Sequence, residues 1–286
     1  MADKHAADPE CIATSSKKVD IRSIVPIAID IEATGFEPHC KVISVGMACV
    51  YPDGNSWETA LFTMPVPRFP ETASGMQVVL PQKIEGAWTG VDAGIPAGQI
   101  ANYGDFDEDT WSFWTMKDED GNRNIDALIA NIDWSRYEEK AGDENDVWVD
   151  VMTTIDTWCV DILERGYIPR IVSDNPSFDI GVCNEGIRKA YGDSKLTRAW
   201  AHSSTGTQYY QNWLVPPRIN NIPMELNGTT VTSCYNTVKD LSIFTTAAKM
   251  GWIQEEEPLV KCTHNHRADV DALSIASRYA AYARNI

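Results

Sequence analysis

Apolar positions dominate or alternate along the first quarter of the chain in the way that strands require. Residues 24–31 form an almost continuous apolar run, which indicates a buried strand. The segments 41–54 and 56–65 alternate apolar and polar positions, and a Pro-Asp-Gly turn separates them. The pattern therefore predicts that the chain opens with a meander of three strands.

Beyond this meander the period of the apolar positions changes. Residues 66–104 are rich in Gly and Pro and show little periodicity, which is typical of a long connection. Helical spacing then predicts helices over 108–119, 125–133, 146–167, 176–192, 238–251 and 266–285. Two further apolar segments, 168–174 and 228–234, predict a fourth and a fifth strand. Strands followed by alternating helices and strands predict an α/β fold with a mixed five-stranded sheet flanked by helices.

Length and composition place the chain among globular proteins. It has 286 residues, of which 43% are hydrophobic, enough for one large domain or two small ones. Residues 1–22 are polar and lack the apolar core of a signal peptide, so we expect a flexible arm before a domain over 23–286. No apolar run approaches the roughly 18 residues that suggest a membrane-spanning helix. The seven cysteines include no C-x-x-C pair, which favours free thiols in a reducing, cytoplasmic compartment.

The net charge of −17 limits the classes of partner. Broad, non-specific binding to a polyphosphate surface needs basic patches, and such a charge argues against it. A nucleic acid bound through metal ions in a small acidic cleft is still compatible with this charge.

Two acids interrupt the first apolar run. Asp30 and Glu32 lie two residues apart, so in a strand their side chains project from the same face and repel each other. A divalent cation between them would turn the repulsion into attraction, and carboxylate oxygens suit Mg²⁺ and Mn²⁺. Most Asp-x-Glu triplets are strand ends with solvated acids. The triplet therefore supports a metal site only if acids from other segments join it.

Two later segments supply such acids. Asp179 lies in the first turn of a helix that follows a strand, and Asp271 lies in the last helix with His266 five residues before it. An acid at a helix start is usually a surface residue that complements the helix dipole. Four acids in three ordered segments, with a histidine at a fixed distance from the last, form a more specific set.

This set resembles a known family. The segments "DIEATG", "NPSFD" and "HRADVDA" occur in the order of the three motifs of the DEDDh exonucleases, the RNase T and polymerase-proofreading type. The resemblance implies an RNase H-like fold, and a chain of this length then carries a long insertion after the third strand, at about 66–145. It also implies that four acids bind two Mg²⁺ or Mn²⁺ ions and that His266 is the general base; these acids are Asp30, Glu32, Asp179 and Asp271.

The resemblance extends to substrate contacts. It implies that the backbone at Ala33 and the Thr34 hydroxyl contact the terminal ribose, in a turn that includes Gly35. Phe36 is expected to stack on the last base or to cover the core, and Asn175 keeps a family residue in the second motif. Asp174 departs from the family pattern, and its role stays open.

The implied function is a two-metal-ion 3′–5′ exonuclease that releases nucleoside 5′-monophosphates from the 3′ end of DNA or RNA. Because relatives that resemble RNase T often pair, the resemblance also allows a homodimer. Neither the sequence nor the resemblance separates DNA from RNA or single from double strands.

Other interpretations compete with this one. An RNase H-like endonuclease or a non-catalytic nucleic-acid-binding module would share the fold. Cys262, His264 and His266 alternate along the chain and, with Cys234, would suit a structural zinc site. His264 also lies five residues before Asp269, so it competes with His266 for the role of the base.

Overall fold

The structure is a computed structural model, and the residues that it describes fall into several stretches. These are 24–36, 40–75, 82–84, 87–89, 97–117, 119, 121, 123–132, 144–191, 223–226, 229–232, 238–240, 245, 247–251, 254–262 and 265–285. The predicted N-terminal arm, residues 1–22, lies outside this part of the chain.

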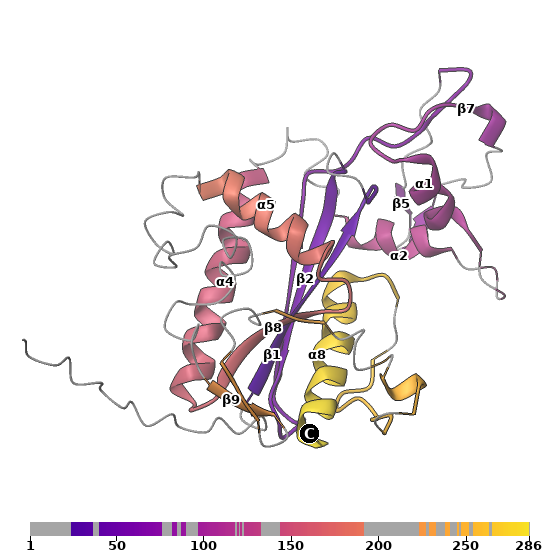
Figure 1. The fold of residues 1–286 in the computed structure, drawn as a ribbon. Coiled ribbons are helices and arrows are strands. Elements are labelled where there is room, and N and C mark those ends of the chain that lie inside the picture. Colours follow the sequence, from indigo (N-terminus) through magenta and orange to yellow (C-terminus); the bar gives the residue numbers. More distant parts are fainter. Residues whose placement is uncertain are drawn as a thin grey trace, which may run out of the picture.

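A mixed sheet forms the centre of the molecule (Figure 1). Its strand order is β11-β8-β1-β2-β3. The strands are β1 (Ile24–Ala33), β2 (Val42–Val50), β3 (Trp57–Thr63), β8 (Ile168–Ser173) and β11 (Val238–Asp240). The first three pair antiparallel as a meander, whereas β8 runs parallel to both β1 and β11. The predicted α/β class, with a mixed sheet flanked by helices, is confirmed.

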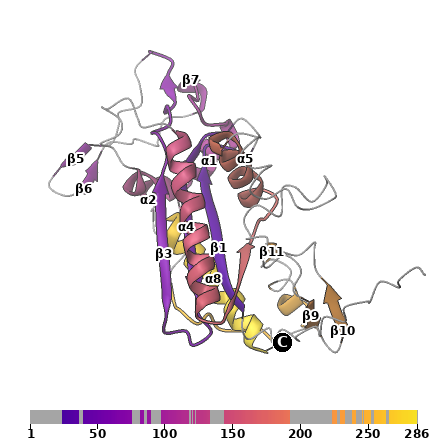
Figure 2. The same ribbon diagram turned by 90° about the vertical axis from the view of Figure 1, so that its left-hand side faces the viewer.

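Helices cover both faces of this sheet, as the two views in Figures 1 and 2 show. Helices α4 (Glu144–Glu164) and α5 (Asp179–Tyr191) pack on one face, and α8 (Ala268–Asn285) packs on the other. The side chains of β1 alternate between the two cores. Val25, Ile27 and Ile29 join the α4 and α5 core, while Ile24 and Ala28 join the α8 core. Burial of both faces explains why β1 has the nearly continuous apolar sequence of a central strand.

A third hydrophobic cluster lies beyond one end of the sheet. Helices α1 (Glu108–Thr115) and α2 (Asn124–Asn131) build it from residues that include Phe69, Phe106, Trp111 and Trp114. The connection that leads to α1 contains two short antiparallel pairs and one turn of 3₁₀ helix, Ala97–Gln99. The pairs are β4 (Glu71–Thr72) with β7 (Ile100–Asn102) and β5 (Gln82–Ile84) with β6 (Ala87–Thr89).

The fifth strand of the sheet is not the one that the sequence predicts. The predicted strand over 228–234 contains β10 (Thr229–Thr232), which pairs with β9 (Pro223–Leu226) in a separate two-stranded sheet. The fifth strand is instead β11, at the start of the segment predicted as a helix over 238–251. Short apolar runs do not distinguish strand from helix, and β11 forms through pairing with the distant strand β8. Helical residues do follow within that segment, at 245 and 247–249.

Within the described residues, no helix combines the length and the apolar composition that crossing a membrane requires.

Candidate metal centre

The site begins at the end of β1, where the strand changes from apolar to acidic. Asp30 and Glu32 continue the row of Ile24 and Ala28, so they lie on the face of the sheet that α8 covers. Glu32 is 8% exposed, and Asp30 is half-buried. The sequence-based expectation that the two carboxylates share a face therefore agrees with the strand geometry.

A glycine on the neighbouring strand lets α8 approach these acids. Gly46 of β2 pairs with Asp30, and a Cβ atom at this position would lie only 1.9 Å from the carbonyl carbon of Ala268. The backbone at the start of α8 therefore rests directly on β2. Because Asp271 lies in the first turn of α8, this close approach places its carboxylate beside β1, where it is 2% exposed.

The acids from the three segments gather in two adjoining groups. In the first, one ligand atom each from Glu32, His266 and Asp271 lies within 4.8 Å of the others. In the second, the same holds for Asp30, Asp174 and Asp179. The structure thus brings together all four acids named by the sequence pattern, and it adds Asp174.

The turn between β8 and α5 fixes Asp179. Ser173, the last residue of β8, donates a hydrogen bond from its hydroxyl to the Asp179 carboxylate, and this hydroxyl accepts one from the Asn175 N–H at 2.9 Å. The Asn175 carbonyl accepts the Asp179 N–H at 3.0 Å, and its side-chain oxygen accepts the Ser177 hydroxyl at 2.9 Å. Asn175 therefore organises this turn, and its predicted contact with substrate stays a prediction.

Burial, together with crowding, raises the pKa of three of these carboxyl groups. Burial raises the pKa of Asp30 and of Glu32 well above the usual range, and repulsion from the neighbouring acids adds to the effect. Burial also raises the pKa of Asp179 to about 7, although the hydrogen bond from Ser173 opposes the rise. Such a cluster is stable in its ionised form only when positive charge is placed among the carboxylates.

His266 lies two residues before α8, at the edge of the first group. Its backbone has φ of 55°, the left-handed conformation that a non-glycine residue adopts at a cost of about 1–3 kcal/mol. Its ring meets the rings of Phe113 and Trp114 nearly at right angles, with centroids 5.3 Å and 5.5 Å away. The preceding residue, Asn265, donates its N–H to the Asp271 carboxylate at 3.3 Å.

The competing choice of base involves Asp269 and His264. Asp269 belongs to neither of the two acidic groups found among the described residues, and it forms an ion pair with Arg267, with 2.7 Å between Oδ1 and Nε. His264 lies outside the described residues. Of the two candidate pairs, the structure places His266 and Asp271 together.

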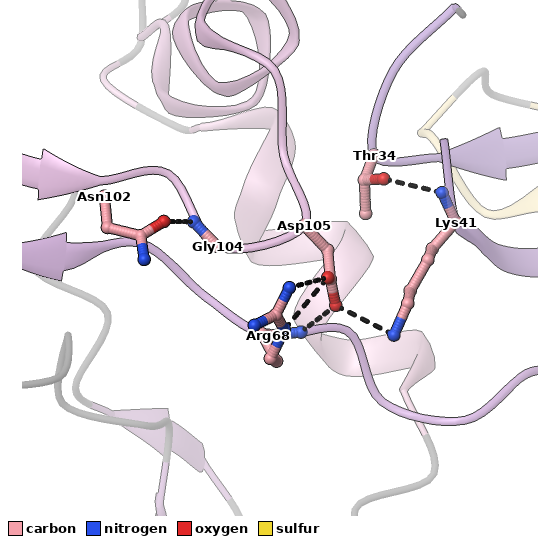
Figure 3. Close-up of polar contacts among 6 residues, drawn as sticks. All are labelled: Thr34, Lys41, Arg68, Asn102, Gly104 and Asp105. Carbon is pink, nitrogen blue, oxygen red and sulfur yellow. Dashed lines mark hydrogen bonds and ion pairs between the residues drawn. The ribbon is translucent and has the colours of Figure 1, made fainter. Parts of the chain in front are cut away.

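The turn after β1 holds the residues for which substrate contacts are predicted. Thr34 is fully buried, and its hydroxyl accepts the Lys41 N–H at 2.9 Å (Figure 3). Ala33 and Gly35 are buried as well, so only Phe36, which is 71% exposed, faces outward. The Thr34 side chain thus closes the turn, and the predicted contacts of Ala33 and Thr34 with a ribose stay predictions.

An ion-pair network supports the far side of the same turn. Asp105, whose side chain is 6% exposed, binds the Arg68 guanidinium at 2.9 Å and the Lys41 ammonium at 3.1 Å (Figure 3). Burial alone would raise the pKa of Asp105, but its hydrogen bonds to Arg68 and Lys41 outweigh that effect and lower it. Lys41 directly precedes β2, and its backbone N–H binds the Thr34 hydroxyl. The ion pairs of Asp105 therefore stabilise the same turn through Lys41.

A pocket of about 300 Å³ opens beside the second acidic group. Phe36 and Phe178 lie on one side with their ring centroids 5.3 Å apart, and Trp148, Ser177 and Lys189 also line the pocket. Phe178 directly precedes Asp179 in the chain, and Glu144 and Glu185 also line the pocket. The two phenylalanine rings suit the flat face of a nucleic-acid base.

The zinc alternative receives no support from the residues that the structure describes. Among these residues, the groups that could hold a metal are the two acidic ones, and neither includes Cys262. Its thiol is half-buried and contacts the Val260 carbonyl at 3.9 Å. The other proposed ligands, Cys234 and His264, lie outside the described residues.

Sequence analysis left two features of the site without a role. Asp174 follows directly on β8, which was the only signal that it shares a site with Asp179. The contact of α1 with His266 had no signal, because the two segments are far apart in sequence.

Comparison with known proteins does not decide the function. No protein-family model and no curated protein matches this chain, so its function must be inferred from the geometry of the site.

Proposed function

We propose that this protein is a metal-dependent 3′–5′ exonuclease with an RNase H-like fold. One observation carries the proposal: carboxylates from β1, the β8–α5 turn and α8 converge on one place and meet a histidine there. The motif resemblance supports the choice of exonuclease, and the sheet order with its antiparallel meander and parallel strands is compatible with the fold.

The donor set fits divalent metal ions. The five acids offer only carboxylate oxygens, which Mg²⁺ and Mn²⁺ prefer. The second group, Asp30 with Asp174 and Asp179, would hold one ion, and Glu32 with Asp271 would hold the other. When bound, the ions would stabilise the attacking and the leaving oxygen of a phosphodiester.

The chain's own residues would supply the remaining chemistry. His266 would accept a proton from the attacking water, a role that suits a side chain which titrates near neutral pH. Phe36 and Phe178 would stack on a base at the end of the strand. The buried turn at Thr34 would fix the end of β1, so that Asp30 and Glu32 keep their positions during the reaction.

A degradation assay tests the proposal. Linear DNA and RNA, single- and double-stranded and labelled at the 5′ end, are incubated with the wild type and with Asp30→Asn, in Mg²⁺, in Mn²⁺ and in excess EDTA. We expect a ladder that shortens from the 3′ end in either metal, and no product with EDTA or with the variant. Activity that survives both changes would overturn the proposal.

A circular single strand separates this proposal from its nearest alternative. An exonuclease leaves the circle intact because the circle has no 3′ end. Efficient cutting of the circle would assign the protein to the endonucleases. Binding of the linear strands without any cleavage would assign it to the non-catalytic binding modules.

A further inference from the structure

Helix α1 reaches the proposed base from outside the three acidic segments. Trp114, in its last turn, is 2% exposed, and its ring lies at 80° to the His266 ring with 5.5 Å between centroids. Phe113, which is 40% exposed, meets the same imidazole at 88° and 5.3 Å. Two adjacent side chains of one helix therefore contact the histidine, and their own ring centroids are 5.1 Å apart.

Trp114 also connects this histidine to the strand that carries the acids. Its indole N–H donates a hydrogen bond of 3.2 Å to the carbonyl of Ala33, the residue after Glu32. A buried indole with a satisfied N–H has one defined orientation. The ring can thus set the distance between the imidazole and the end of β1.

The start of α1 is fixed to the same strand end. Asp107 caps the helix by accepting the Thr110 N–H at 2.6 Å, and its own N–H donates to the Thr34 carbonyl at 3.1 Å. A Cβ atom at Gly35 would lie 2.2 Å from the Asp107 carboxylate, so a larger residue there would displace the side chain that caps α1. Both ends of α1 are therefore anchored on the residues that follow Glu32.

The His266 backbone needs such external support. It lies in the left-handed region, which persists at a non-glycine residue only when the surroundings enforce it. Ring contacts from α1 supply such support to the imidazole.

We propose that Trp114, assisted by Phe113, is a positioning residue that holds the His266 imidazole toward Glu32 and Asp271. The inference rests on the proposed function, because it assigns a role within the same reaction. Trp114 is not a catalytic residue, since it acts only through His266. Its loss should lower kcat and leave KM nearly unchanged, because the substrate still binds while the base is misplaced.

Three substitutions in the full-length chain test this role. Trp114→Leu removes the ring, Trp114→Phe keeps an aromatic ring without the indole N–H, and Trp111→Leu is the matched control. Trp111 lies on the same helix, is 5% exposed and packs against Phe69 and Phe106. We expect kcat to fall about 10- to 100-fold in Trp114→Leu. Trp114→Phe keeps a ring but loses the hydrogen bond to Ala33, so it should recover only part of the rate, and Trp111→Leu should lose much less. An equal fall of kcat in the two leucine variants would show that Trp114 only packs in the core and would contradict the proposal.

A double-mutant cycle with His266→Asn distinguishes a positioning role of Trp114 from a role in packing alone. If Trp114 acts through His266, then Trp114→Leu should cause no further loss of rate once the imidazole is absent. Additive losses would contradict the proposal. Melting temperatures of all variants show whether each one folds, and Trp114→Phe keeps the test valid if Trp114→Leu does not.

A measurement independent of nuclease activity separates failure of this inference from failure of the proposed function. Because the chain has only five histidines, its proton NMR spectrum contains few imidazole signals, and each can be followed separately. One signal should be displaced by ring currents, disappear in His266→Asn and move in Trp114→Leu but not in Trp111→Leu. A signal that behaves in this way without any nuclease activity would refute the function and keep the contact. A signal that does not respond to Trp114→Leu would refute the contact itself.

Discussion

Asp179→Asn should stabilise the metal-free protein at pH 8, although the substitution removes a residue of the proposed active site. Burial raises the pKa of Asp179 from 3.8 to about 7 in the folded protein. At about 1.4 kcal/mol per pH unit, this difference corresponds to an unfavourable contribution of about 4 kcal/mol once the group is ionised. Asparagine has the same shape and keeps an oxygen that can accept the Ser173 hydroxyl, so most of this contribution should be relieved.

The sign of the pH dependence follows from the raised pKa. The folded state holds the proton more tightly than the unfolded state, so the wild type is fully stabilised below pH 3.8 and loses stability as the pH rises to about 7. The advantage of Asp179→Asn should therefore be small near pH 4, grow up to pH 7 and then stay constant. We expect a difference of about 1–4 kcal/mol at pH 8, because the weaker hydrogen bond of the amide offsets part of the gain.

Urea unfolding in EDTA, followed by tryptophan fluorescence, measures this difference at each pH. In the wild type, saturating Mn²⁺ at about 100 times the dissociation constant should restore about 2.7 kcal/mol, and the variant should gain much less. The reasoning is refuted if Asp179→Asn is less stable than the wild type at pH 8 in EDTA, or if the difference does not change with pH.

Three further predictions concern the geometry of the site. Gly46→Ala should destabilise the fold by about 1–3 kcal/mol and reduce activity, because its Cβ would overlap the backbone at the start of α8. Urea unfolding measures this loss, and Gly98→Ala, which has open space around it, is the control. Asp174→Asn should lower Mn²⁺ affinity or rate about 10- to 100-fold in a calorimetric titration and a rate assay, whereas Asp109→Asn, an exposed acid on α1, should change neither. His266→Asn should lower the rate about 100-fold with Mn²⁺ binding kept, since asparagine tolerates the left-handed backbone but cannot act as a base; a rate near that of the wild type would assign the base elsewhere.

The local geometry of the acids could be predicted from the sequence because it depends on short-range periodicity. Asp30 and Glu32 share a face of β1 through the period of two in a strand, and Asp271 falls in the first turn of the last helix. The α/β class followed from the order of apolar segments in the same way. These features need no information about which distant segments touch.

The features that sequence analysis missed depend on long-range contacts. Strand β11 has only three residues and forms by pairing with β8, so its own sequence resembled the start of a helix. The burial of Thr34 likewise results from the pairing of its turn with Lys41, and its motif-based contact with substrate stays a prediction. The approach of Trp114 to His266 joins segments that lie 152 residues apart in the chain, and no periodicity encodes it.

The central claim is that carboxylates from three segments form one centre for two divalent ions. Calorimetric titration of Mn²⁺ into the metal-free wild type, Asp30→Asn and Asp109→Asn tests it most directly. The account predicts that the wild type and Asp109→Asn bind two ions and that Asp30→Asn loses at least one of them. A wild type that binds no ion, or an Asp30→Asn variant that binds Mn²⁺ as the wild type does, would contradict it.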